Sequence, residues 1–297
     1  MALSKSKRYT INEAKIQRWL AEGRGTGMGR SYLPWLTVRD LSSDGNSHRV
    51  LGRVSDRVHH LFSNIEYAHF VVFDFDKKTR DIREQFPLDR LHTLALAKRL
   101  GYKHPRQPGS DAWMVMTTDL VVTSEENGVL NYKAYAIKEK KARTNNRVQE
   151  KLAIERAYWQ SQGIAFDVLD ETDVPRAYLR SLDWLSGAHD LTRLIEPSPG
   201  FFLDTARSLM ASVVEQSSST LPLTHLCTNL DAKQNIPPGS HLLLARYLIA
   251  TRTLTTDLSR PQVWKAPVSA FSAGDMLVSP TTQISDKPIC DALPIHI

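Results

Sequence analysis

The sequence is poor in cysteine and has no long apolar run. Its two cysteines, Cys227 and Cys290, can build neither a disulfide framework nor a four-cysteine zinc site. No stretch of about 18 apolar residues indicates a membrane helix, and residues 1–20 lack the unbroken apolar segment of a secretory signal. We therefore expect a cytoplasmic protein with no membrane partner. Its composition, 41% hydrophobic and 24% charged over 297 residues, is typical of a globular chain of up to two domains.

Positive charge is in excess, with a formal net charge of +6. This excess indicates a polyanionic partner such as nucleic acid. Lysine and arginine concentrate before residue 160, as in "KEKKARTNNR" (138–147), and are sparse over 187–297. If the protein holds DNA, its first half should hold it, and the later part is better suited to contacts with protein. The segment "GRGTGMGR" (23–30) has four glycines at two-residue spacing, which is not the G-x-G-x-x-G nucleotide fingerprint, so we expect a flexible basic loop there.

Hydrophobic periodicity predicts an α/β first domain over residues 1–171. Helices are expected over 11–21, from Ser63 onward, and over 150–162. Strands are expected over 81–88, 116–123 and 132–140, and a buried strand over 164–171. The order strand, helix, strand at the end of this domain implies a crossover unit and hence a mixed sheet.

After about residue 172 the pattern becomes mainly helical and ends in a short β-prone piece, "TLTTDL" (253–258). Helices followed by a small hairpin are compatible with a winged helix, which we assign to residues 172–259. Residues 260–297 contain five prolines and many Ser and Thr, so we expect an extended tail that a partner orders.

Several ionisable residues of the first domain fall on predicted helices or strands. Asp119 stands in a strand otherwise made of Leu120, Val121 and Val122, where a carboxylate needs a cation or hydrogen bonds to compensate its burial. Converging carboxylates would suit Mg²⁺, and a nearby lysine could orient water or stabilise charge at a phosphate. The further candidates on helices and strands are Glu66, Glu84, Lys140 and Glu155.

Long stretches of residues 20–185 resemble the TnsA family, the endonuclease subunits of heteromeric cut-and-paste transposases. The matching segments include "EGRGTGMGRSYLPWLTV", "RVHHLFSNIEYAHF", "MTTDLVV" and "EKLAIERAYW". The resemblance implies a restriction-endonuclease-like domain followed by a winged-helix domain. It also implies an active site of a helix glutamate, a strand aspartate and a Q-x-K segment. By motif these positions are Glu66, Asp119 and Lys140, with Glu66 and Asp119 holding the metal, Mg²⁺ or Mn²⁺, as two ions.

Two features depart from this pattern or remain open. Lys138 occupies the position we assign to the family glutamine, and a protonated lysine cannot ligate a metal. Lys138 could replace a cation, contact the scissile phosphate, which we prefer, or let Glu139 approach the metal through a bulge. Glu155 matches a further family glutamate whose role is open.

Each candidate also has a purely structural interpretation. Glu66 fits a capping box with Ser63, and Glu84 could form a surface ion pair with Arg83. Glu155 could pair with Lys151 on a solvated helix face, and the lysines at 138 and 140 could protect an edge strand from pairing.

The resemblance implies a metal-dependent DNA endonuclease that cuts the 5′ ends of a transposon. It would act with a TnsB-like transposase and a TnsC-like AAA+ ATPase, in the cytoplasm at the nucleoid. Two alternatives remain: a noncatalytic DNA-binding assembly factor in which Lys138 has disabled the site, and a standalone restriction-type nuclease.

Overall fold

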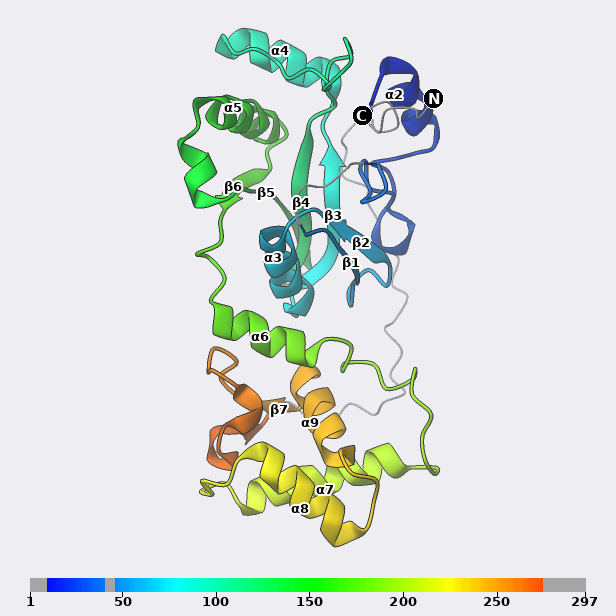
Figure 1. Cartoon of the computed structure of the whole chain (residues 1–297), viewed down its shortest axis with the longest axis vertical. Helices are drawn as coiled ribbons and strands as arrows, with labels where there is room; N and C mark the ends of the chain where they lie inside the picture. Colours follow the sequence, from blue (N-terminus) through cyan, green and yellow to red (C-terminus); the bar gives the residue numbers. More distant parts are fainter. Residues whose placement is uncertain (1–9, 41–45, 275–297) are drawn as a thin grey trace, which may run out of the picture. The chain divides into compact units, whose positions relative to one another are not determined.

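The computed structural model describes residues 10–40 and 46–274 (Figure 1). The chain divides into two compact units, with the boundary between Val174 and Pro175. In the described part of the chain, no helix is both long and apolar enough to cross a lipid bilayer.

The first unit is built on a mixed four-stranded sheet in the order β3-β4-β5-β6, in which β6 runs parallel to β5 and the other pairs are antiparallel. A separate two-stranded sheet joins β1 and β2. The strands are β1 (His48–Leu51), β2 (Val58–Leu61), β3 (Thr79–Pro87), β4 (Thr117–Glu126), β5 (Val129–Ile137) and β6 (Ala165–Leu169). The helices are α2 (Glu13–Ala21), η1 (Gly29–Ser31), α3 (Asn64–Phe75), α4 (Arg90–Leu100), η2 (Lys140–Thr144) and α5 (Asn146–Ser161).

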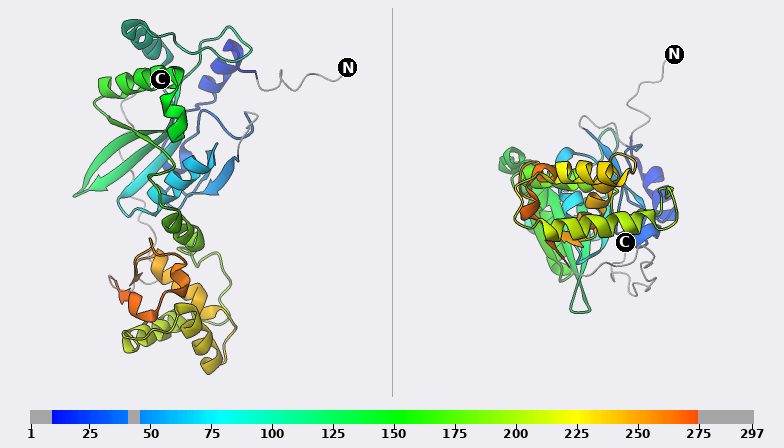
Figure 2. Two further views of the ribbon diagram at one scale, coloured as in Figure 1. Left: turned by 60° about the vertical axis from the view of Figure 1, so that its left-hand side comes forward. Right: turned by 90° about the horizontal axis from the view of Figure 1, so that it is seen from below.

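Alternating side chains of the sheet feed two apolar clusters. Phe70 of α3 packs with Leu120 and Ile137 in one cluster. Val121 and Ala134, which are an odd number of residues from Leu120 and Ile137 on their strands, pack with residues of α4 and α5 in the other. Because successive strand side chains point to opposite faces, α3 covers one face of the sheet, and α4 and α5 cover the other. Figure 2 shows this sheet from a second side. The prediction of an α/β domain with a mixed sheet is confirmed.

Two local expectations for the first unit are wrong. The expected buried strand over 164–171 is β6, which lies at the edge of the sheet and alternates between exposed and half-buried residues. The glycine segment at 23–30 is a hydrogen-bonded series of turns: all four glycines have positive φ, and Gly25 N–H donates to Leu33 O at 2.6 Å. A Cβ on Gly27 would lie 2.5 Å from the carbonyl oxygen of Ser31, so the turn requires glycine there.

The second unit is mainly helical. Its helices are α6 (Arg176–Leu185), α7 (Phe201–Glu215), α8 (Leu223–Gln234), α9 (Ser240–Ala250) and the short η3 (Val263–Lys265) and η4 (Val268–Ala270). Leu244 and Leu248 of α9 are fully buried in this unit, and α9 contacts both α7 and α8. The guanidinium of Arg246 binds the carbonyl oxygens of Trp184 and Ser186, so this arginine closes the C-terminus of α6.

Residues 260–274 do not form the expected extended tail. β7 (Leu254–Thr255) pairs with β8 (Ser272–Ala273), and between these strands Val263, Val268 and Phe271 are buried. These apolar residues anchor the segment despite its prolines, because their burial offsets the entropy lost on ordering. The rest of the predicted tail, 275–297, lies outside the described residues.

Candidate active site

Asp119 lies where the pairing of β4 with β5 ends. The ladder stops at Leu120 opposite Tyr135, and the carboxylate of Asp119 then accepts the next amide, with Ile137 N–H donating to Oδ2 at 2.6 Å. The same oxygen accepts a hydrogen bond from Lys138 Nζ at 2.6 Å. Asp119 is 9% exposed, so a backbone amide and an ammonium together compensate a largely buried carboxylate.

Lys138, and not Lys140, is the lysine beside Asp119. β5 ends at Ile137, and the chain then turns into η2, which begins at Lys140. Lys140 is exposed, and its backbone N–H donates to Glu171 Oε2 at 2.9 Å. The expectation that Lys140 closes the pairing strand is therefore wrong. Lys138 continues the face of Ala134 and Ala136, whose side chains are both fully buried.

Glu66 approaches the same carboxylate from the first turn of α3. The helix begins as the sequence predicts: Ser63 is its N-cap and accepts a hydrogen bond from Glu66 N–H at 3.1 Å. In return Glu66 Oε2 accepts from Phe62 N–H at 3.0 Å, one residue before the expected partner. Burial and the charge of Asp119 raise the pKa of Glu66 from 4.5 to about 7. Glu66 is thus a capping residue and a neighbour of Asp119 at once.

Glu155 enters the cluster from α5. Only 5% of Glu155 is exposed, and its Oε1 accepts a hydrogen bond from Thr118 Oγ1 at 2.6 Å. Thr118 in turn accepts from Trp159 Nε1 at 2.7 Å. Burial and Asp119 raise the pKa of Glu155 from 4.5 to about 8. The interpretation of Glu155 as part of a solvated helix face is wrong, because the helix presents this residue to the sheet.

The cluster holds more negative than positive charge. Burial by itself would lower the pKa of Lys138, but the nearby carboxylates of Asp119, Glu155 and Glu66 raise it, so this lysine is protonated at neutral pH. One ammonium faces three carboxyl groups, and burial, followed by the charge of Asp119, raises the pKa values of Glu66 and Glu155. A divalent cation would favour the ionised form of both glutamates.

Asp119 and Glu66 can supply oxygen ligands to such a cation, although the site is not complete by itself. Among the described residues, no three His, Cys, Asp or Glu side chains form a ready metal site. Mg²⁺ fits this donor set because proteins commonly hold it through one or two carboxylates, with water and substrate phosphates as the other ligands. In the described part of the chain the hydrogen bonds to Asp119 both end on Oδ2, which leaves Oδ1 for a cation.

Glu84 belongs to a different, structural network. It is fully buried on β3 and accepts two hydrogen bonds from Arg57, at 2.8 and 2.5 Å. His59 Nδ1 lies 2.7 Å from its Oε2. The expected surface pair with Arg83 is wrong, because Arg83 lies beside Asp81 instead, at 3.4 Å. The signal missed in the sequence is "RVHH" (57–60), in which Arg57 and His59 share one side of a segment with two-residue period.

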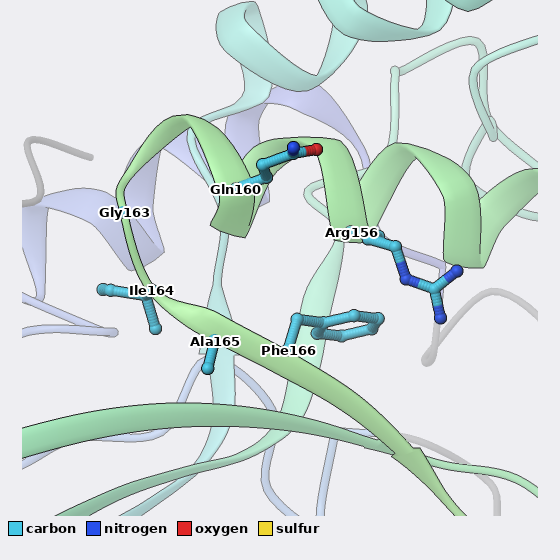
Figure 3. A pocket seen from close by; sticks show the side chains of 6 residues that line it. All are labelled: Arg156, Gln160, Gly163, Ile164, Ala165 and Phe166. Carbon is cyan, nitrogen blue, oxygen red and sulfur yellow. The ribbon is translucent and has the colours of Figure 1, made fainter.

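A shallow pocket also lies on this unit, between the end of α5 and β6 (Figure 3). Its lining includes Arg156, Gln160, Ile164 and Phe166. The ring of Phe166 faces the Arg156 guanidinium, and Arg156 Cζ lies 5.7 Å from the centroid of that ring. The lining includes no carboxylate, so this pocket is not a candidate for the metal chemistry.

Sequence comparisons identify the family of the chain. Residues 76–171 match the family model described as TnsA-like endonuclease N terminal, and residues 173–258 match the one described as TnsA endonuclease C terminal. The chain is also similar to the Transposon Tn7 transposition protein TnsA of Escherichia coli, with 38% identity over 176 residues. That match covers 59% of this chain and 63% of the relative. With both halves of the family matched in order, the chain belongs to the TnsA family.

Proposed function

We propose that this protein is the endonuclease subunit of a Tn7-like transposition system and hydrolyses phosphodiesters at the 5′ ends of the element. The observation that carries the proposal is the cluster of Asp119, Glu66 and Glu155 around the ammonium of Lys138, in a chain of the TnsA family. Carboxylates with an adjacent lysine are the parts that metal-assisted attack of water on a phosphodiester requires.

Asp119 and Glu66 would hold the divalent ion, Mg²⁺ or Mn²⁺. Such an ion, when bound, supplies Lewis-acid stabilisation of the phosphate and lowers the pKa of water. Glu155 is the third carboxylate in electrostatic reach of Asp119, and it is the residue that a second ion would need. The number of ions remains a prediction.

Lys138 takes the role that the sequence assigned to Lys140. Its ammonium hydrogen-bonds Asp119, and 36% of its side chain is exposed, so it can turn toward an incoming phosphate. A protonated amine at this place stabilises the negative charge that builds up on phosphate oxygens as water attacks. This role also explains why a lysine stands at position 138, where the motif was expected to have glutamine. Lys138 is then the lysine of the Q-x-K segment, and Ala136 stands at its glutamine position.

We base the fold classes and the partners proposed here on the family. We assign the first unit to the restriction-endonuclease-like class, supported by a mixed sheet with helices on both faces. We assign the second unit to the winged-helix class, supported by α7 to α9 followed by the β7–β8 pair. The partners would be transposon-end DNA, a TnsB-like transposase and a TnsC-like ATPase, the latter bound through the second unit. A DNA substrate places the action at the nucleoid.

One observation favours a noncatalytic assembly factor instead. Lys138 Nζ donates a hydrogen bond to an oxygen of Asp119, and a lysine that kept this bond would compete with a metal ion for the carboxylate. The test is reconstituted excision with the partner subunits and Mg²⁺, with strand breaks mapped at both ends of the element for wild type and Asp119→Ala. Asp167→Ala is the matched control, because it removes an exposed strand aspartate that pairs with Lys133 at 2.6 Å.

We expect Asp119→Ala to lose the 5′ cuts and keep the 3′ cuts and joining, while Asp167→Ala behaves as wild type. Unchanged breaks on both strands would mean that the nuclease lies in another subunit. Cleavage of plain duplex DNA by the isolated protein would instead identify a standalone nuclease.

A further inference from the structure

One face of α5 carries a row of charged residues that leads from the surface into the candidate active site. Arg147, Lys151 and Glu155 are four residues apart, so they lie along one face of the helix. Glu155, at the end of the row, reaches Thr118 beside Asp119. Lys151 lies one turn closer to the helix N-terminus and is exposed. The row therefore starts at the surface and ends in the cluster.

Most cations of this region have a carboxylate partner. Arg147 lies 2.5 Å from Glu150, Arg143 lies 2.7 Å from Asp170 and Lys141 lies 3.0 Å from Glu139.

Lys151 differs from these three cations. Partial burial lowers its pKa, and the two charged neighbours that lower it further, Arg147 and Lys138, are both cations. Lys151 therefore stands in a positive field that would attract an anion, within electrostatic reach of the lysine on Asp119.

We propose that Lys151 binds the backbone phosphate that neighbours the scissile phosphate on the cleaved DNA strand. The inference rests on the proposed function, because it takes the phosphate at Asp119 and Lys138 as the scissile one. The four residues of α5 from Lys151 to Glu155 rise about 6 Å, so Lys151 lies within about two phosphate steps of about 3.4 Å rise each from the Glu155 end of the cluster. Lys151 is thus a positioning residue: it sets the register of the strand over the carboxylates and does not touch the reacting atoms.

Arg156 provides a matched control on the same helix. It lies five residues after Lys151, about 140° around the helix axis. Its guanidinium faces Phe166 at the pocket beside β6 (Figure 3). Replacing Arg156 by Gln removes the same charge from the same helix at a different face.

The test is binding of the full-length protein to a transposon-end duplex in Ca²⁺, over a range of NaCl concentrations, for wild type, Lys151→Gln, Lys151→Arg and Arg156→Gln. We expect Lys151→Gln to reduce the slope of log affinity against log salt by about 0.9, as for one lost phosphate contact, and to weaken binding roughly three- to tenfold. Lys151→Arg should restore the slope, and Arg156→Gln should retain it. In the reconstituted reaction Lys151→Gln should need more transposon-end DNA than wild type for half-maximal 5′ cleavage, whereas Arg156→Gln should not.

Equal slopes for Lys151→Gln and wild type would overturn the inference and leave the proposed function intact. A loss of slope equally large for Arg156→Gln would also overturn it, because the effect would then reflect total charge. The proposed function itself would be contradicted if Asp119→Ala kept the 5′ cuts and if DNA binding by the wild type did not depend on the salt concentration. Thermal unfolding midpoints within about 2 °C of wild type show that each variant is folded.

Discussion

Replacing each of the two candidate lysines by methionine separates the structural assignment from the one made by motif. Lys138→Met removes the ammonium that donates to Asp119 at 2.6 Å. Lys140→Met leaves the one hydrogen bond described for Lys140 in place, because that bond comes from its backbone amide to Glu171. Methionine is similar in length to lysine and carries no charge, so both variants change mainly the electrostatics.

The expected magnitudes follow from these contacts. Loss of a preorganised charge at a developing oxyanion lowers the rate by about 10²- to 10³-fold, so Lys138→Met should reduce 5′ cleavage by that factor. A hydrogen bond to a charged group contributes about 1.5 to 3 kcal/mol to stability. Since 36% of the Lys138 side chain is exposed, solvent screening should bring its contribution to about 1 kcal/mol. Lys140→Met should cleave within about threefold of wild type.

The assay is the single-turnover rate of 5′-strand cleavage in the reconstituted system at saturating Mg²⁺, together with urea unfolding of each variant. Lys138→Arg, which keeps the charge, should retain part of the activity. The reasoning would be refuted by the reverse pattern, with Lys140→Met inactive and Lys138→Met active, since Lys140 would then have to reach the phosphate from outside the cluster.

Two further predictions concern buried carboxylates. Burial alone would raise the pKa of Glu84, but His59 and Arg57 outweigh it and lower this pKa from 4.5 to about 2. The stabilisation is therefore complete above about pH 4.5 and is lost as the pH falls toward 2. Glu84→Gln should destabilise the protein by about 3 to 5 kcal/mol at pH 7 and remove this acid dependence in urea titrations at pH 3 and 7; an unchanged midpoint would contradict the buried network. The pKa of Glu155 has the opposite shift, from 4.5 to about 8, so without metal its effect on stability worsens as the pH rises through that range. Glu155→Gln should therefore raise the melting temperature of the metal-free protein at pH 9 and change it little at pH 5. A lower melting temperature of the variant at pH 9 would contradict the raised pKa of Glu155.

The local elements could be read from the sequence because their signals are local. Ser63 and Glu66 are three residues apart at the start of an apolar run, and α3 begins there with Ser63 as its cap. The apolar alternation around Asp119 and the stripe of 150–162 likewise correspond to β4 and α5. The order strand, helix, strand was then enough to predict a mixed sheet, because the parallel pairing of β5 with β6 follows from the crossover.

The contacts within the site could not be read in the same way. Glu84 and Arg83 are neighbours in sequence, but the charge that compensates Glu84 comes from Arg57, 27 residues away. Similarly, Lys151 is the obvious helical partner of Glu155, whereas Thr118, 37 residues away, donates the hydrogen bond to it. Sequence proximity identifies possible pairs, and burial decides between them.

The sequence by itself determined that an aspartate in an apolar strand, a capping glutamate and a lysine-rich strand end would occur in one α/β domain. Only the tertiary structure decided which lysine faces Asp119. That choice depends on where β5 stops, and β5 stops at Ile137 because its amide turns from the β4 ladder to the Asp119 carboxylate, while Lys138 N–H pairs with Leu169 of β6. Such nonlocal hydrogen bonds cannot be predicted from the local sequence of residues 138 to 140. Moving the end of β5 by two residues is enough to change which lysine lies in the site.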